Sequence, residues 1–204
     1  SPYLSVPFFP KSVIKKSWRL YLSYFMRHTG ANCIWIIYPL HITTNLGGDK
    51  FWVGVIHTVN TASQFFVMRF VDRFRGKTLI YAGLILSSIT FFFFFTLAQN
   101  FYQLLPMQVL LGCSWSCLYV GSLLHLMRRN VEKTTFTGML DSVINLAAVA
   151  GALIGGIISE LFGFRATMYT AAALAAIGLC LFRPGVGRAS MPVISFLNYL
   201  RKPY

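Results

Sequence analysis

Residues 136–159, FTGMLDSVINLAAVAGALIGGIIS, form an apolar stretch that is long enough to cross a membrane as a helix. About 20 mostly apolar residues in a helix span the hydrocarbon core of a bilayer. The stretch holds one acidic residue, Asp141, and no basic one. It therefore predicts a transmembrane helix.

Further stretches of the same kind occur along the chain, at Tyr21–Thr43, Phe51–Val71, Thr78–Ala98, Phe101–Met127 and Arg165–Phe182. Short connections rich in Gly, Asn and Arg separate them. The chain is 56% hydrophobic and only 11% charged, whereas a water-soluble domain carries about 25% charged residues. A membrane-spanning sheet would show alternating polarity, which these stretches lack. The sequence thus predicts an all-α membrane protein with six transmembrane helices.

The basic residues predict the orientation of these helices. Sixteen of the eighteen Lys and Arg residues lie before the first predicted helix or just inside it, or after the second, fourth and sixth, and only Lys50 and Arg165 lie in the other connections. Basic residues stay on the cytoplasmic side, so both termini of a multi-pass plasma (inner) membrane protein are expected there. Residues 1–19 would form a cytoplasmic linker, 20–183 the transmembrane bundle and 184–204 a cytoplasmic tail. The net charge of +13 does not indicate a nucleic-acid partner, because the basic residues form no continuous patch.

A weak internal repeat links the two halves of the bundle. Phe51–Thr58 resembles Phe136–Ser142, and Asp72–Phe74 resembles Glu160–Phe162. The offset corresponds to three helices, and an odd number of helices inverts the second copy across the membrane, as in many transporters. The pattern favours two inverted three-helix repeats.

Polar and aromatic residues form stripes on four of the helices, whereas the third and sixth are nearly free of polar side chains. His28, Asn32 and Trp35 share one face of the first helix, and His57, Asn60 and Gln64 share a face of the second. The corresponding face of the fourth helix carries Gln108, Trp115 and Tyr119. A mixture of hydrogen-bonding and aromatic groups is typical of a small-molecule site. For any single residue, the better explanation is that it forms a hydrogen bond between helices, which is worth about 0.6 kcal/mol. The whole set of residues favours the lining of a substrate cavity.

Two charged residues lie inside predicted helices, and each has two alternative interpretations. Asp141 is either a proton or cation site or a solvated acid near a helix N-terminus, where the helix dipole favours it. Arg27 either extends to the cytoplasmic interface, which is the favoured reading, or meets an anionic substrate.

The fifth predicted helix also carries a packing signal. Gly151, Gly155 and Gly156 belong to a run of small residues that lets another helix approach closely. No catalytic motif, metal-ligand spacing or cofactor signature is present, so neither an enzyme, a metal site nor a cofactor is expected. The cysteines lie in apolar runs and are expected to be reduced.

Two groups of residues resemble the major facilitator superfamily. Arg69 to Lys77, which contain Asp72 and Arg73, resemble the Asp-Arg-x-Gly-Arg loop motif that follows the second helix of each six-helix half. The stronger resemblance is to the last three helices of that superfamily and is carried by Gly112, by residues 132–138, by Asp141 to Asn145, by Gly151 to Gly156 and by Phe162 to Arg165. It covers about residues 17 to 182 and identifies the chain as similar to the C-terminal half of a twelve-helix transporter.

The resemblance implies a mechanism and partners. The first and fourth helices would line the substrate cavity, the second and fifth would meet an N-terminal half or a second copy, and the third and sixth would lie outside. Asp72 and Arg73 would belong to a cytoplasmic gate. The expected function is transport of a small organic solute through the lipid bilayer by alternating access, with proton coupling assigned to Asp141. The alternative is a membrane interaction or assembly protein that does not transport.

Overall fold

The computed structural model describes residues 11–94, 98–130 and 133–182, and every regular element in these ranges is helical. α1 spans Lys11–Asn45, α2 spans Lys50–Val71, and α3 spans Gly76–Ile89 before continuing as the π-helical turn η1, Thr90–Phe94. The 3-10 turn η2, Phe101–Gln103, leads into α5, Leu104–Arg129, and α6 spans Lys133–Leu181. The all-α prediction is confirmed for the described chain. The predicted tail 184–204 and residues 1–10 of the predicted linker lie outside the described residues.

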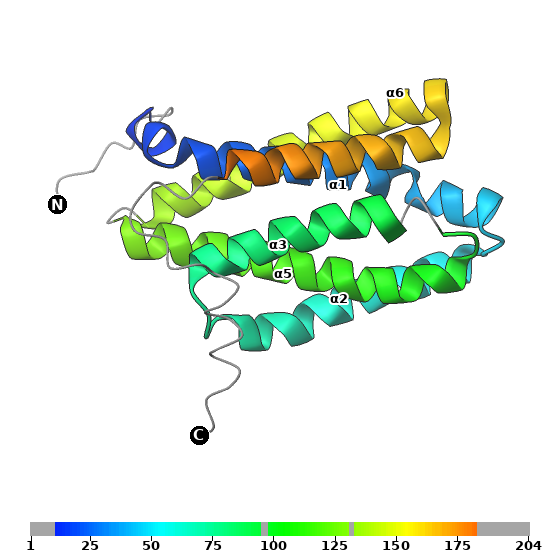
Figure 1. Ribbon diagram of the computed structural model, residues 1–204, viewed down its shortest axis with the longest axis horizontal. Helices are drawn as coiled ribbons and strands as arrows, with labels where there is room; N and C mark the ends of the chain where they lie inside the picture. The colour runs from blue at the N-terminus through cyan, green and yellow to red at the C-terminus, as the bar shows by residue number, and fades with distance from the viewer. Residues whose placement is uncertain (1–10, 95–97, 131–132, 183–204) are drawn as a thin grey trace.

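α6 consists of two helical segments that meet at Gly163. Gly163 has φ 82° and ψ 173°, a conformation that glycine adopts readily and that other residues adopt only with strain. In Figure 1 the yellow segment of α6 runs to one end of the molecule and the orange segment returns beside it. The short connection predicted between the spans 136–159 and Arg165–Phe182 therefore contains a turn, at Gly163.

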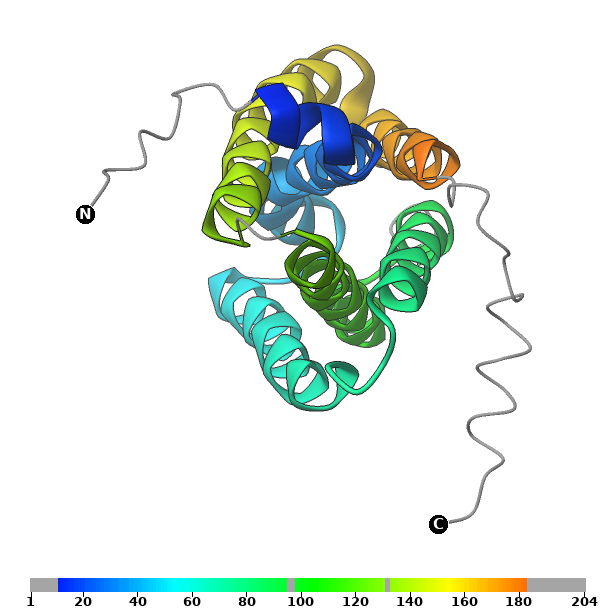
Figure 2. The same ribbon diagram turned by 90° about the vertical axis from the view of Figure 1, so that its left-hand side faces the viewer.

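The helices form two layers, which Figure 2 shows nearly end-on. α1 packs along both segments of α6, and α5 lies between α2 and α3. α3 also contacts α6 and so closes one side of the bundle. This arrangement turns the inner faces of α1 and α5 toward each other.

Two apolar cores are separated by a polar layer. One core, which includes Ile42, Phe91 and Leu104, lies toward the end with the α1–α2 turn. The other includes Tyr24 and Leu118 and lies toward the opposite end. On α1, α3 and α5 the residues between these cores are Arg27, Ser87 and Ser114, all of them buried. The middle of the bundle is therefore its most polar level.

The outer surface carries many large apolar side chains, as expected for contact with lipid or another helical unit. Exposed examples are Phe65 and Phe66 on α2 and Val149, Leu153 and Ile157 on α6. Within the described ranges, two helices are long and apolar enough to cross a membrane, over Phe101–Arg128 and Lys133–Leu181, and the apolar helix Gly76–Phe92 is shorter. At 49 residues, α6 has more than twice the length needed for one crossing. The division into six spans stays a prediction.

Candidate functional site

A cavity of about 190 Å³ lies between α1, α2 and α5. Four residues predicted to line a substrate cavity surround it, namely His28, Asn32, Trp35 and Trp115. Its other lining residues are Arg27, Ala31, Asn60, Gln64 and Leu111. The polar faces of three helices thus meet in one place, although contact of these side chains with a solute stays a prediction.

Aromatic rings form one wall of this cavity. The ring centroids of His28 and Trp115 lie 4.9 Å apart with an interplanar angle of 30°. Tyr119, also predicted to line the cavity, stacks on the other end of this row, with its ring 5.7 Å from that of Trp115 and only 13° from parallel. We call His28, Trp115 and Tyr119 the aromatic row. Of these three residues, His28 and Trp115 line the cavity and offer ring surface to a bound molecule. Tyr119 is not among the lining residues, so its contact with a solute stays a prediction.

Amide side chains tie α2 to α5 beside the cavity. Gln64 Nε2 donates to Asn60 Oδ1 at 2.6 Å, and Asn60 Nδ2 donates to the backbone oxygen of Gln108 at 3.2 Å. The Gln108 side chain does not line this cavity. It is fully buried among packed residues, and its Nε2 donates to the Tyr38 hydroxyl at 2.6 Å. Its Oε1 has no hydrogen-bond partner among the described residues.

Arg27 points into the bundle, so the favoured expectation that it extends to the cytoplasmic interface is wrong. Its side chain is only 2% exposed. Nε donates to Ser87 Oγ at 2.8 Å and Nη2 donates to Ser114 Oγ at 2.9 Å. The guanidinium carbon also lies 5.6 Å from the ring centroids of both Phe91 and Trp115. These partners on α3, η1 and α5 hold the side chain at mid-depth, where it reaches no water-facing end of the bundle.

Ser87 and Ser114 were missed as site residues in the sequence. The third predicted helix is nearly free of polar groups, yet Ser87 on it is completely buried and accepts from Arg27. The available signal was Gly83, which lies one turn before Ser87. A Cβ at Gly83 would lie 2.7 Å from the backbone oxygen of Ser114, so glycine is what brings α3 close enough to α5 for both serines to reach one guanidinium.

The predicted gate and coupling residues lie at the end of the bundle that carries the α2–α3 turn. Asp72 is the C-cap residue of α2 and Arg73 follows it, and both are exposed. No ion pair joins either of them to another described residue, so a latch formed by these two residues stays a prediction. Asp141 is exposed on α6, and the Asn145 amide donates to its backbone oxygen at 3.0 Å.

The glycines of α6 differ in what they face. A Cβ at Gly151 would lie 2.6 Å from the Cβ of Asn32, and a Cβ at Gly155 would lie 2.6 Å from the backbone oxygen of Cys33. Both glycines therefore sit where α6 crosses α1. Gly156 is exposed, and a Cβ there would meet no described atom within 4 Å, so it takes no part in this crossing.

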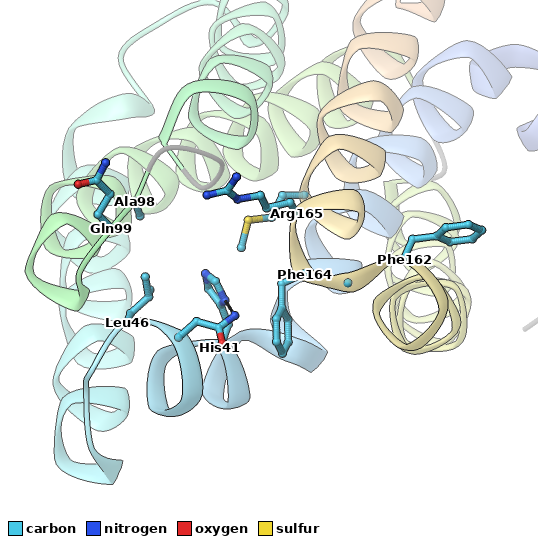
Figure 3. Close-up of a pocket in the computed structure, with 10 residues that line it drawn as sticks. His41, Leu46, Ala98, Gln99, Phe162, Phe164 and Arg165 are labelled. Carbon is cyan, nitrogen blue, oxygen red and sulfur yellow. Dashed lines mark hydrogen bonds between the residues drawn. The ribbon is translucent and has the colours of Figure 1, made fainter.

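A second pocket, of about 580 Å³, opens at the end of the bundle that carries the α1–α2 turn and Gly163. Figure 3 shows His41, Phe164 and Arg165 around it, while Phe162 points away from the other labelled side chains. The His41 ring lies 5.0 Å from that of Phe164, and its Nδ1 is 3.2 Å from Asn45 Nδ2. This pocket lies at the opposite end of the bundle from the predicted gate residues.

Comparison with known families decides the affiliation of this bundle. The sequence profile described as Major Facilitator Superfamily matches residues 20–193. The chain belongs to the major facilitator superfamily. No curated protein matches it.

Membership in the major facilitator superfamily makes this an integral membrane protein of a family that transports solutes and is not a family of enzymes. Among the described residues of this major facilitator chain, no three His, Cys, Asp or Glu side chains are placed to hold a metal ion. The cysteines at positions 33, 113, 117 and 180 are free thiols.

Proposed function

We propose that this chain moves a small organic solute across the plasma (inner) membrane by alternating access, as the C-terminal half of a secondary active transporter. The observation that carries the proposal is the cavity between α1, α2 and α5, which combines amide, imidazole and indole groups at mid-depth of the bundle. Such a mixture in an otherwise apolar bundle suits selective binding of a solute.

The proposed architecture is six spans arranged as two inverted three-helix repeats. Counting α6 as two segments at Gly163, the described chain provides α1, α2 and α3 for one repeat and α5 with the two parts of α6 for the other. The α2–α3 turn and the α5–α6 junction lie at the same end of the molecule as the start of α1 (Figure 1). Most described basic residues gather at this end, which supports a cytoplasmic location for it and for both termini.

The proposed partner is an N-terminal six-helix half or a second copy of the chain. The exposed apolar faces of α2 and α6 would supply surface for this contact, and the exposed Ile85 and Ile89 of α3 would contact lipid. Rocking of the two units about the cavity would expose it to each side of the membrane in turn. Asp72 and Arg73, on the proposed cytoplasmic end, would stabilise one of the two states.

Trp115→Ala and Asn32→Ala should each lower solute flux at least about tenfold, which corresponds to about 1.4 kcal/mol of lost interaction. The first substitution removes the centre of the aromatic row, and the second removes an amide from the cavity wall. The measurement is uptake of a panel of radiolabelled carboxylates, amines, sugars and amino acids into proteoliposomes that contain the full chain.

The matched control is Trp18→Ala. Trp18 is 46% exposed near the start of α1 and is not among the residues that line the cavity. This variant should retain its flux within about twofold, which is the range expected for a surface substitution. Equal flux in all three folded variants, or no flux of any solute with the unmodified chain, would favour a membrane interaction or assembly protein.

Asp141→Asn should remove the stimulation of flux by a proton gradient while leaving exchange between equal solute concentrations intact. Asp141 is exposed in the first segment of α6, near the proposed cytoplasmic end of the bundle. The amide of asparagine keeps the shape of the carboxyl group but cannot take up a proton. Flux would be compared with and without a gradient of about one pH unit, equivalent to about 1.4 kcal/mol per proton. Glu160→Gln, at an exposed acid elsewhere on α6, is the control, and unchanged stimulation in Asp141→Asn would reject Asp141 as the coupling residue.

A further inference from the structure

The cavity between α1, α2 and α5 contains one permanent positive charge and no negative one. Arg27 lines it, and none of its lining residues is acidic. The five acids of the chain are Asp49, Asp72, Glu132, Asp141 and Glu160. No ion pair joins Arg27 to any acid in the described part of the chain.

The serines that hold Arg27 satisfy hydrogen bonds without neutralising its charge. Ser87 and Ser114 occupy Nε and Nη2, and Nη1 donates to no described residue. A hydroxyl is neutral, so the guanidinium keeps its full charge in the middle of an apolar bundle. Such a charge costs at least about 2.5 kcal/mol at the centre of a membrane.

A structural role alone does not account for this cost. A long apolar side chain at position 27 would fill the space between Phe91 and Trp115 without burying a charge, and well-packed apolar groups are often as stable as buried ions. Arginine side chains usually lower their cost by extending to the interface, but the two serines hold this one beside the cavity. The charge therefore has a use that a neutral side chain could not provide.

Resting on the proposed transport function, we propose that the cavity binds small organic anions, with the anionic group at Arg27 and the flat body of the molecule against the His28 and Trp115 rings that line it. A carboxylate and a phosphate share the required chemistry, because both present oxygens that accept from a guanidinium. Binding of the anion would supply the negative charge that the cavity lining lacks. The neighbouring His28 and Trp115 rings, 4.9 Å apart, favour a planar body.

Quenching of Trp115 fluorescence by ions tests the charge preference without knowledge of the substrate. The other three tryptophans would be changed to Phe in the full chain, held in detergent micelles at constant ionic strength. Iodide is the anionic probe, caesium the cationic probe and acrylamide the neutral one. Each quenching constant would be divided by the value for free tryptophan. The corrected constant for iodide should exceed that for caesium at least about threefold, because a nearby positive charge concentrates anions. Equal quenching by the two ions, or stronger quenching by caesium, overturns the proposal.

Substitutions at Arg27 separate its charge from its shape. Arg27→Gln should lower iodide quenching at least about threefold and leave acrylamide quenching unchanged. Arg27→Lys keeps the charge, so its iodide quenching should stay within about twofold of that of the protein with Arg27. Arg165→Gln, at the second pocket, should have no effect. Unchanged iodide quenching in Arg27→Gln overturns the proposal. If that variant does not fold, the iodide-to-caesium ratio of the protein that keeps Arg27 and has Trp115 as its single tryptophan decides.

A series of solutes with one ring and different charges connects this preference to transport. Benzoate, phenyl phosphate, benzamide and benzylamine would be tested for uptake by the full chain in proteoliposomes. Uptake of benzoate or phenyl phosphate above benzamide supports the proposal and distinguishes the two anionic groups. Uptake of benzamide or benzylamine alone overturns the anion proposal while the transport function stands. An iodide preference without uptake of any solute leaves an anion-selective cavity and rejects transport.

Discussion

Gly155→Leu should prevent α1 and α6 from packing, whereas Gly156→Leu should leave the bundle folded. A side chain at Gly155 would start 2.6 Å from the backbone oxygen of Cys33, and backbone atoms in the centre of a helix cannot move aside. Overpacking of a core by extra methylenes costs about 1–3 kcal/mol of stability. The cost of a collision with backbone atoms should lie at the upper end of this range or above it. The loss is measured as the thermal unfolding temperature in detergent, with the fraction of monodisperse protein as a second reading.

The neighbouring glycine is a close control for this prediction. Gly156 lies on the same turn of α6 and has the same helix propensity cost, but a Cβ there would meet nothing within 4 Å among the described residues. Leucine at this position should raise helix propensity slightly and change the unfolding temperature little. Equal stability of the two leucine variants would contradict a close approach of α1 and α6 at Gly155.

The double substitution Ser87→Val with Ser114→Val should destabilise the protein strongly, and adding Arg27→Met should restore much of the loss. The two hydroxyls accept from Arg27 at 2.8 and 2.9 Å. A hydrogen bond to a charged group contributes about 1.5–3 kcal/mol, so valine at both positions leaves a buried cation without its acceptors. Methionine removes that cation and lets all three residues pack as apolar groups.

Thermal unfolding of the double and triple variants in detergent provides the measurement. Ser88→Val serves as the control, because Ser88 is the next residue on α3 and its hydroxyl donates only to the backbone oxygen of Leu84. It should lower stability by no more than about 1 kcal/mol. A triple variant that is less stable than the double variant would mean that Arg27 contributes to folding through contacts other than these two serines.

The helical class and the meeting of polar faces could be predicted because both depend on local sequence. Runs of apolar residues fix the helices, and the spacing of His28, Asn32 and Trp35 fixes one face of α1 through the helical period. The same reasoning on the second and fourth predicted helices brought Asn60, Gln64 and Trp115 to the cavity. A stripe of polar groups in an apolar helix has few places to point other than the interior.

The features that were missed depend on the relative position of helices. Consecutive residues differ by about 100° around a helix, so only one of Gly155 and Gly156 can face α1, and sequence alone does not say which. Gln108 shares a helix face with Trp115, but its amide is drawn to Tyr38 by a hydrogen bond between helices. The inward direction of Arg27 depends on serines 60 and 87 positions later in the chain.

That last separation has a consequence for how the protein is made. α1 leaves the ribosome with Arg27, His28 and Asn32 at mid-length, and at that moment neither of the acceptors for its guanidinium exists. Ser114 is synthesised 87 residues later, after α2 and α3 have emerged. A helix with an unsatisfied cation enters lipid poorly, so we expect α1 to wait at the membrane surface or beside the insertion machinery. Its final seating would then be a late step of biogenesis, completed only when α5 arrives.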